Sequence, residues 1–566
     1  MNTNLLTTQW HTLPEATVRR LQVEKLRRYL RDVVVPFSPH YRPLFHEHGF
    51  HPDDLHTLED LDRLPLTSKL DLSSTPEHPN RIRDFLVLPD KAVLARRPAN
   101  ILHALIHGRE HVRRALDAEF RPVFMTSTTG RSAEPIPFLF TRYDLEHLAV
   151  TGKRVFEVCG AAPDLRLLNL FPFAPHLAFW QTHYGGVEFG VFQTSTGGGK
   201  VMGTEGNLRL IRKLKPDILI GMPTFLYHVL HQAADEGARL ENLRRLVLGG
   251  EKVPDGMKRK LVNLAAELGS PGLDIVSTYG FTEARMAWGE CANSFGKHDV
   301  GFHLYPDLGI VELIDPRTGR LVPPGQPGEI VFTPLDGRGT VVIRYRTGDY
   351  LDGRLTYERC PGCGRTVPRL LGNISRSTEI KSLNFGKLKG TLVDFNQLEH
   401  VLDNVDDVGS WQLELRKLHD DPLEVDELIL HVQKINGADE TRLANDLRAR
   451  LYNAAELHPN RIEFHSAEEL RRRQGVGVQL KESKILDNRP GAVPQGSPPA
   501  SSRGVSPHAF APVPQGSSPA SSGGVSPLDP IPTNRTGTAT QIVSTNPAPA
   551  LANVTTTHRE PLEATK

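Results

Sequence analysis

The sequence predicts an α/β protein: a large domain with mostly parallel sheets flanked by helices, a small α+β domain and a disordered tail. Three observations lead to this prediction. Strand-like and helix-like segments alternate from residue 207 to residue 278, and such alternation is typical of parallel sheets. Further short strands and helices follow residue 375. From residue 491 onward Pro, Ser, Gly, Ala and Thr dominate, a composition that buries too little apolar surface to fold.

Composition excludes several classes of protein. A length of 566 residues fits two or three domains. The net charge of +1 indicates neither a nucleic-acid partner nor an anionic membrane. No apolar run approaches the ~18–20 residues that cross a bilayer, and the first residues lack the pattern of a secretory signal. Four cysteines are no disulfide framework at this length, so we expect a reducing, cytoplasmic setting.

The first 120 residues contain one clear element. Residues 16–34 place apolar side chains at helical spacing between Lys and Arg, which predicts an amphipathic helix. Residues 57–69 predict a short helix that ends at a proline and a polar turn. Residues 76–115 show no clear pattern, and we interpret them as an insertion.

A polar turn between two predicted strands is a candidate anion site. The strands span residues 122–125 and 136–141. Hydroxyl and backbone N–H groups in such a turn can converge on a polyphosphate, although a plain polar hairpin is the alternative. The candidate residues are Thr126, Ser127, Thr128, Thr129, Gly130 and Arg131.

Aromatic residues gather after a predicted helix at 144–159 and a predicted buried strand at 167–173. Such a cluster is usually core, but as the lining of a pocket it would suit a flat or apolar acyl group. The members are Phe171, Phe173, Phe179, Trp180 and Tyr184, and the candidate pocket residues are Phe173, His176, Trp180, Tyr184 and Gly221.

The parallel region places three loops at strand ends, after predicted strands at 218–221, 245–248 and 274–278. Ligands bind beyond the carboxyl ends of such strands. Glycine allows a close backbone approach, an aromatic ring can stack on a purine, and a carboxylate can bind Mg2+. The candidate residues are Gly250, Glu251, Tyr279, Gly280, Thr282 and Glu283.

A predicted strand at 340–345 runs into a turn at Thr347-Gly348, which would place Asp349 at its end. A carboxylate in that position can bind the vicinal hydroxyls of a ribose, and a plain hairpin edge is the alternative. Beyond residue 375, helices are predicted at 394–402 and 438–451 and strands at 428–432 and 461–464.

Several of these motifs occur together in the order and spacing of the adenylate-forming enzymes. They are FMTSTTGRS, LGGEKVP, STYGFTEA, GEIVFTPLDGRGTVVIRYRTGDY and CPGCGRTVPRLLGNISRS. Over about residues 16–490 the chain resembles the phenylacetate–CoA ligase family in particular. The resemblance implies an adenylation domain at 1–374, a mobile lid domain at 375–490 and an additional tail at 491–566.

The resemblance also implies a role for each candidate residue. The implied roles are phosphate binding for Thr126 to Arg131, adenine contacts for Gly250, Glu251 and Tyr279, an α-phosphate contact for Thr282, Mg2+ binding for Glu283, ribose contacts for Asp349 and Arg376, and the domain hinge for Glu379. The family usually has glycine where this chain has Ser127, and residues 383–389 resemble an insertion.

A lysine near the end of the lid domain completes the implied site. Its spacing from Ile485-Leu-Asp-Asn-Arg489 matches Lys481, with Lys484 as the alternative. A mobile cation can bridge a carboxylate and the α-phosphate while the two anions approach. Leu480 replaces the glycine that usually precedes this lysine.

The cysteines suggest a metal site. Cys360-Pro-Gly-Cys363 is a knuckle that offers two thiolates to one metal. Some members of the family place Cys, His, Cys and Cys at points that correspond here to Cys291, His303, Cys360 and Cys363, which implies a structural zinc. His298 is an alternative ligand, a reduced Cys pair in a turn is the alternative without metal, and Cys159 is predicted to be core.

The implied activity is that of an AMP-forming acid–thiol ligase. An aryl, arylacetic or other carboxylic acid and MgATP give acyl-AMP and pyrophosphate, and coenzyme A then takes the acyl group after the small domain rotates. Two alternatives stay open: another acceptor, such as a protein thiol or a deazaflavin coenzyme, and a nucleotide-binding scaffold without catalysis. Dimers are usual among similar proteins, but the sequence leaves the oligomeric state and the acid open.

Overall fold

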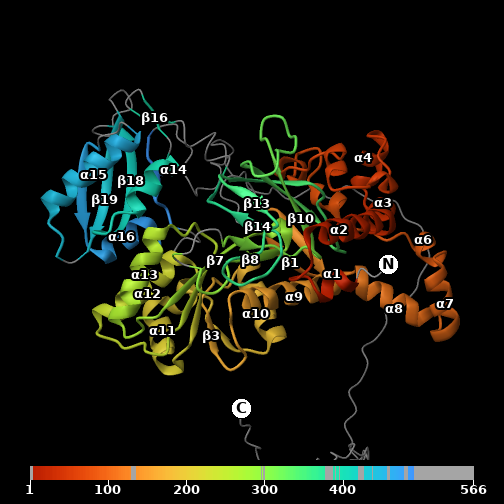
Figure 1. The fold of residues 1–566 in the computed structure, drawn as a ribbon, viewed down its shortest axis with the longest axis horizontal. Coiled ribbons are helices and arrows are strands. Elements are labelled where there is room, and N and C mark those ends of the chain that lie inside the picture. Colours follow the sequence, from red (N-terminus) through yellow and green to blue (C-terminus); the bar gives the residue numbers. More distant parts are fainter. Residues whose placement is uncertain are drawn as a thin grey trace, which may run out of the picture. The chain divides into compact units, whose positions relative to one another are not determined.

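The fold is taken from a computed structural model (Figure 1). The structure describes residues 4–128, 135–294, 296, 300–376, 386–388, 391–393, 395–417, 426–435, 437–455, 459–476 and 482–489. Residues 1–499 form one compact unit. The predicted tail at 491–566 lies outside the described residues. Among the described helices, none combines the length and the apolar character that a membrane crossing requires.

The N-terminal helix is present as predicted and is longer than a single α-helix. Its α-helical part passes into a π-helical turn at Leu30–Val34, directly before Pro36. Proline has no N–H to donate, which disturbs the regular bonding of the preceding turn. The α-helices of this region are α1 (Asn4–Thr8), α2 (Glu15–Tyr29), α3 (Val35–Phe37), α4 (Tyr41–Glu47) and α5 (Lys69–Leu72).

One expectation for the following region needs correction, and the interpretation of residues 76–115 as an insertion stays a prediction. The single helix predicted at 57–69 is wrong, because the chain forms a 3-10 turn at Glu59–Arg63, extends past Pro65 and begins α5 only at Lys69. The unassigned stretch is helical and comprises α6 (Lys91–Ala95), α7 (Pro98–His107) and α8 (Arg109–Phe120), with further 3-10 turns at Pro52–Asp54 and Arg81–Phe85. Helix α7 buries none of its side chains.

A six-stranded sheet forms the centre of the large part of the chain, in the order β4-β3-β5-β6-β7-β8. All neighbours pair in parallel except β7 and β8, which confirms the predicted parallel sheet. The strands are β3 (Arg166–Asn169), β4 (Phe192–Ser195), β5 (Ile218–Gly221), β6 (Arg245–Leu248), β7 (Asp274–Phe281) and β8 (Met286–Gly289).

Helices cover both faces of this sheet (Figure 1). Side chains at alternate strand positions, such as Leu219 and Leu246, pack against α11, α12 and α13, while Ile218 and Val247 pack against α9 and α10. This alternation follows from the two-residue period of a strand. The helices are α9 (Arg142–Val158), α10 (Leu177–Phe189), α11 (Gly199–Leu214), α12 (Pro223–Asp235) and α13 (Asp255–Glu267).

Antiparallel strands make up the remainder of the large part. Strands β10, β11, β12 and β15 form one sheet in that order, β13, β14 and β9 form a second, and β1 pairs with β2. The bounds are β1 (Pro122–Ser127), β2 (Pro137–Thr141), β9 (Phe302–His303), β10 (Gly309–Ile314), β11 (Gly328–Pro334), β12 (Tyr345–Leu351), β13 (Arg354–Thr356), β14 (Arg369–Leu371) and β15 (Ile374–Arg376).

The strand predicted at 340–345 is wrong. Strand β12 begins at Tyr345, so Asp349 lies inside the strand and not at its end. In the pairing of β11 with β12, Val331 faces Arg346 and Glu329 faces Tyr350. A step of two residues along β11 thus corresponds to a step of four along β12, so β12 contains two extra residues. They form a bulge in which Gly348 has a φ of 72°. The predicted turn at 347–348 is therefore a local kink within the sheet.

The last described part is a small α+β fold, as predicted. Its sheet has the order β20-β19-β18-β21, with α14 and α15 against the apolar face around Trp411 and Leu430 and α16 against the other face. The sequence missed β18, β21 and α16. The elements are α14 (Phe395–Asp403), β18 (Val408–Lys417), β19 (Asp426–Lys434), α15 (Glu440–Ala455), β20 (Arg461–His465), α16 (Ala467–Gln474) and β21 (Ile485–Asp487), after a hairpin of β16 (Gly386–Leu388) and β17 (Thr391–Val393).

The strand order of the central sheet indicates where a ligand binds. From β3 the chain proceeds to β4 on one side, whereas from β5 it proceeds to β6 on the other side. The loops that follow β3 and β5 therefore diverge. A crevice opens at such a switch point beyond the carboxyl ends of the strands.

Candidate active site

A cavity lies at this switch point. The loop after β3 is held close to β5, because Leu170 N donates to Ile220 O at 2.7 Å. Gly249 N, after β6, donates to Gly221 O at 3.1 Å. The predicted pocket residue Gly221 thus lies at this edge of the sheet. The cavity is lined by Leu170, Pro172, Gly199, Lys200, Met222, Thr224, Phe225, Val476 and Glu482.

The aromatic cluster next to the cavity is partly core and partly accessible. Phe171 and Phe179 are buried, whereas Phe173 is 62% exposed. Phe173 packs against Phe179 and Trp180 with ring centroids 5.2 and 5.7 Å apart. Trp180 and Tyr184 are half-buried. The core interpretation therefore holds for Phe171 and Phe179, and the pocket interpretation stays a prediction for Phe173, Trp180 and Tyr184.

Ser127 connects three of the predicted site regions. Its N–H donates to Pro175 O at 2.6 Å, and its carbonyl lies 3.2 Å from His176 Nδ1. Thr282 Oγ1 lies 3.5 Å from the same carbonyl. The first residues of the predicted phosphate loop, the pocket histidine and the predicted α-phosphate ligand thus come together at the end of β1.

The two threonines beside Ser127 are buried. Thr126 Oγ1 has no hydrogen-bond partner among the described residues. Thr128 Oγ1 accepts a hydrogen bond from Ile136 N at 3.0 Å, which closes the base of the turn. The other predicted members, Thr129, Gly130 and Arg131, lie outside the described residues.

Tyr279 and Asp349 are in direct contact, although they come from different sheets. Tyr279 Oη donates to Asp349 Oδ2 at 2.8 Å. The sequence predicted Tyr279 in a loop. This prediction is wrong, because β7 continues to Phe281 and pairs with β8. This pairing requires Gly280, where a Cβ atom would lie 2.5 Å from Ala287 Cβ. Arg376 faces Asp349 in the register of β12 and β15.

Two glutamates of the predicted site each accept a hydrogen bond from a neighbouring hydroxyl. Glu283 accepts from Tyr345 Oη at 2.7 Å, and Glu251 accepts from Thr224 Oγ1 at 2.7 Å. Gly250, with a φ of 83°, turns the chain before Glu251. These bonds fix the orientation of two carboxylates that could bind a cation or a substrate hydroxyl.

The second candidate lysine has a structural role. Lys484 Nζ donates to Asp403 Oδ1 at 2.7 Å and lies 4.9 Å from the ring centroid of Trp411. Burial lowers the pKa of Lys484, but the negative charges of Asp403, Glu399 and Glu482 together outweigh burial and raise the pKa above its ordinary value. Lys481 and the predicted hinge Glu379 lie outside the described residues.

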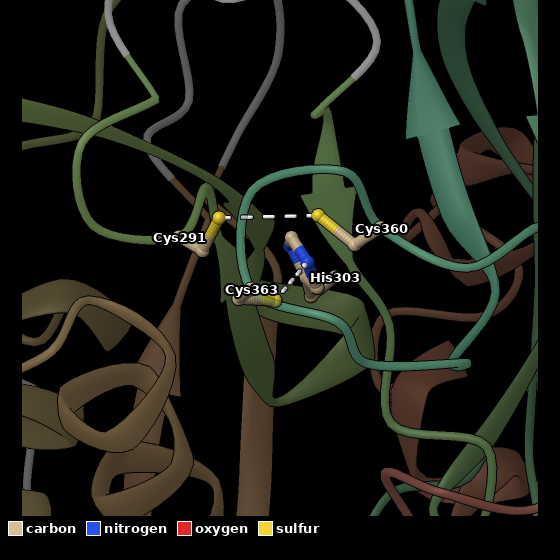
Figure 2. A group of neighbouring side chains, drawn as sticks. All are labelled: Cys291, His303, Cys360 and Cys363. Carbon is tan, nitrogen blue, oxygen red and sulfur yellow. Dashed lines mark hydrogen bonds between the residues drawn. The ribbon is translucent and has the colours of Figure 1, made fainter.

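A second cluster brings together the four predicted metal ligands (Figure 2). The ligand atoms of Cys291, His303, Cys360 and Cys363 all lie within 4.8 Å of one another. Cys363 Sγ is 3.2 Å from His303 Nε2, and Cys291 Sγ is 3.9 Å from Cys360 Sγ. Three sulfurs and one imidazole nitrogen form the donor set of a closed tetrahedral zinc site.

The surroundings of this cluster favour metal binding. His303 Nδ1 lies 3.3 Å from Gly289 O, which leaves Nε2 free to act as a ligand. Hydrogen bonds from Cys291 and Cys360 lower the pKa of Cys363 and so favour its thiolate. Cys159 is separate, and burial raises its pKa to about 12. The alternative ligand His298 lies outside the described residues.

A family model described as AMP-binding enzyme matches residues 152–334, which run from within α9 through β11. Phenylacetate-coenzyme A ligase of Thermus thermophilus is 28% identical over 413 residues, covering 72% of this chain and 80% of the relative. The phenylacetate-coenzyme A ligase of Escherichia coli (strain K12) is 26% identical, and the match covers 72% of this chain and 82% of the relative.

Residues 152–334 thus match the AMP-binding enzyme family, and the chain is similar to phenylacetate-coenzyme A ligases.

Solved structures of a CoA ligase share the fold. A crystal structure of 2-hydroxyisobutyryl-CoA ligase in the postadenylation state has a TM-score of 0.66 and 20% identity, covering 85% of this chain and 92% of that one. The same ligase in the thioesterification state has a TM-score of 0.55 over the same shares of the two chains.

Sequence reasoning missed several residues of the candidate sites. Thr224 and Tyr345 orient the glutamates, and Glu482 lines the cavity. A third cluster, of His431, Glu463 and His465, was also missed. Its signal was the Glu463-x-His465 spacing in a predicted strand, because residues two apart point to the same face.

Proposed function

We propose that this enzyme activates a carboxylic acid with ATP as acyl-AMP and then transfers the acyl group to coenzyme A. One observation carries the proposal most strongly. The Tyr279–Asp349 contact and the Thr282–Ser127 contact place an aromatic ring, a carboxylate and two hydroxyl groups around one edge of the structure. These are the groups that a purine, a ribose and a phosphate require. The phenylacetate-coenzyme A ligases at 26–28% identity support the same reaction class.

In this proposal each described residue keeps one task. Tyr279 stacks on the adenine bordered by Gly250 and Glu251, and Asp349 accepts hydrogen bonds from the ribose. Thr282 donates to the α-phosphate. Glu283 would hold Mg2+, which offsets the phosphate charge. Because Asp349 already accepts the Tyr279 hydroxyl, its carboxylate is oriented before nucleotide binds.

Lys481 is our candidate for the mobile cation. Val476 and Glu482, on either side of residues 477–481, both line the cavity. Lys484 is already engaged with Asp403 and Trp411, which argues against it as the mobile group. A lysine between two approaching anions stabilises the transition state more than the separated reactants.

The aromatic side chains support an aryl or arylacetic acid as the substrate. Phe173, Trp180 and Tyr184 retain accessible surface, and His176 contacts the carbonyl of Ser127. Flat aromatic rings pack well against such a lining. A homodimeric state and a cytoplasmic location stay predictions.

ATP–pyrophosphate exchange tests the proposal. The full chain is assayed with a panel of aryl, arylacetic and fatty acids, with Lys481→Ala and Lys484→Ala in parallel. We expect the wild type to catalyse exchange with aromatic acids. Lys481→Ala should abolish this exchange, whereas the folded fraction of Lys484→Ala should retain it. Exchange without thioester formation would point to another acceptor. ATP binding with no exchange for any acid would reject adenylation of simple acids.

We further propose that Cys291, His303, Cys360 and Cys363 hold a structural zinc ion. The ion would join the β8–β9 segment to the knuckle before β14. Metal analysis of the reduced chain should find zinc, and Cys360→Ser should bind one zinc ion fewer and lose thermal stability. Full zinc content in Cys360→Ser would exclude this assignment.

A further inference from the structure

A group of histidine and glutamate side chains lies in the small α+β fold, away from the nucleotide site. His431 belongs to β19, and Glu463 and His465 belong to β20. The two strands are parallel, with His431 opposite Glu463 and Gln433 opposite His465. Their other face carries Leu430 and Val432 of the apolar core, so the polar groups gather on the face that α16 covers.

The three ligand atoms form a compact triangle. His431 Nδ1 is 2.9 Å from His465 Nε2 and 3.4 Å from Glu463 Oε2, and His465 Nε2 is 3.8 Å from Glu463 Oε2. In tetrahedral zinc sites ligand atoms lie about 2.0–2.1 Å from the ion and therefore about 3.4 Å from each other. The measured separations bracket that value. A circle through the three atoms has a radius of about 2 Å, close to one zinc–nitrogen bond.

A second carboxylate orients His431. Glu414 Oε2 lies 2.9 Å from His431 Nε2, so Nε2 carries the hydrogen and the lone pair of Nδ1 points into the triangle. Glu414 is itself held by Asn488 Nδ2 at 2.8 Å and lies 3.8 Å from Arg473. Carboxylate–histidine pairs of this kind are typical of metal sites, where they set the tautomer of the ligand.

The other two ligands are oriented in the same way. His465 Nδ1 faces Glu469 Oε2 at 3.7 Å, which favours a hydrogen on Nδ1 and a lone pair on Nε2. Glu463 Oε1 pairs with Arg461 Nη1 at 3.1 Å, which leaves Oε2 toward the histidines. Two imidazole lone pairs then face each other at 2.9 Å. A cation between them removes this repulsion, whereas without a cation one ring must give up its favoured tautomer or take a second proton.

We propose that His431 Nδ1, His465 Nε2 and Glu463 Oε2 bind a divalent transition-metal ion, for which zinc is the best fit. Two imidazoles and one carboxylate suit zinc and its neighbours in the first transition series, not Ca2+ or Mg2+, which prefer oxygen. Glu463 is the most exposed of the three side chains, so water can complete the coordination on its side. The ion joins β19 to β20 and, through Glu414, to the chain after β21.

Metal stoichiometry tests this site separately from the cysteine cluster. The full chain is stripped with EDTA under reducing conditions, dialysed against Zn2+ and analysed for zinc per chain. His465→Gln should bind one zinc ion fewer than the wild type, and so should the double variant Cys360→Ser/His465→Gln relative to Cys360→Ser. His231→Gln is the matched control, because His231 contacts Gln433 but lies outside the triangle; its zinc content should equal that of the wild type. Equal zinc content in His465→Gln and the wild type would overturn the proposal.

A second measurement uses chains with an intact triangle. Co2+ bound to thiolates gives a sulfur-to-metal charge-transfer band, whereas Co2+ bound by nitrogen and oxygen gives only weaker ligand-field bands. In Cys360→Ser, added Co2+ should give ligand-field bands without charge transfer. Glu414→Gln should weaken metal binding at this site by about 10- to 100-fold and keep the stoichiometry at saturation. An unchanged dissociation constant in Glu414→Gln, or no ligand-field bands in Cys360→Ser, would contradict the assignment even if His465→Gln does not fold.

Discussion

At the scale of single residues, the contact between Tyr279 and Asp349 is central to the proposed nucleotide site. The tyrosine comes from the central sheet and the aspartate from the antiparallel sheet, so one 2.8 Å hydrogen bond connects the two. Asp349 is also held by its own backbone, because its N–H donates to Thr347 Oγ1 at 3.0 Å. The carboxylate therefore has one well-defined orientation.

We expect Asp349→Ala to weaken ATP binding by about 10- to 100-fold, because a hydrogen bond to a charged group contributes about 1.5–3 kcal/mol. Tyr279→Phe keeps the ring and should weaken binding less than Asp349→Ala does. Calorimetric titration of each variant with ATP measures both effects. Equal affinities for Asp349→Ala and the wild type would remove Asp349 from the proposed site.

Glu482 gives the enzyme a pH dependence with a defined sign. Burial raises the pKa of this carboxyl group to about 8, so the folded chain keeps a proton that the unfolded chain releases near pH ~4.3. Between these values the folded state binds more protons, and its stability falls as pH rises. The melting temperature of the wild type should therefore decrease more between pH 5 and pH 8 than that of Glu482→Gln. If the melting temperatures of the two chains changed equally between pH 5 and pH 8, Glu482 would be ionised in the folded state throughout that range.

At the scale of elements, Lys484 attaches β21 to α14. Its ammonium group bonds to Asp403 at the end of α14, and Leu413 N of β18 donates to Lys484 O at 2.8 Å. Trp411 Nε1 also donates to Asp403 Oδ1, at 2.7 Å. Lys484 thus pairs with the buried carboxylate of Asp403, which also connects α14 to Trp411 of β18.

Lys484→Ala should lower the free energy of unfolding by about 2–3 kcal/mol. This loss is smaller than that for breaking a fully buried ion pair, because the lysine keeps some solvent contact. Lys434→Ala is the control, since Lys434 pairs with Glu440 at the surface and should cost under about 1 kcal/mol. Hydrogen exchange of the β18 amides in the full chain measures the loss of stability in both variants. A smaller effect for Lys484→Ala than for Lys434→Ala would contradict the structural role.

Elements with strong local patterns were predicted well. Strands β5 and β6 have the predicted bounds, because each is a short apolar run between helices. Strand β12 was misplaced because its bulge depends on pairing with β11, and Gly348 reaches its positive φ only in that context. The Tyr279–Asp349 contact involves residues 70 apart in sequence, so local periodicity contains no signal for it.

At the scale of the whole molecule, the family resemblance predicted more than the local patterns did. It indicated the adenylate-forming fold and four candidate metal ligands between residues 291 and 363, whose ligand atoms lie within 4.8 Å of one another. It contained no information on the His431, Glu463 and His465 cluster, which depends on the parallel register of two strands in the small fold. Features particular to one chain must be found in its own structure.

Deleting residues 491–566 tests whether the tail contributes to the enzyme. The Pro, Ser and Gly-rich composition predicts no packed core in this segment. Pyrophosphate exchange and the melting temperature of the truncated chain should therefore match those of the full chain. A loss of exchange on truncation would instead assign a catalytic or regulatory role to the tail.

The bulge in β12 also has a consequence for how this gene can change during evolution. Tyr345, Thr347, Asp349 and Leu351 all point inward, and the two extra residues preserve that alternation across the kink. A deletion of one codon here would move Tyr345 and Asp349 to opposite faces of the sheet. We therefore expect related sequences to accept substitutions around Gly348 but to contain no single-residue insertions or deletions in this strand.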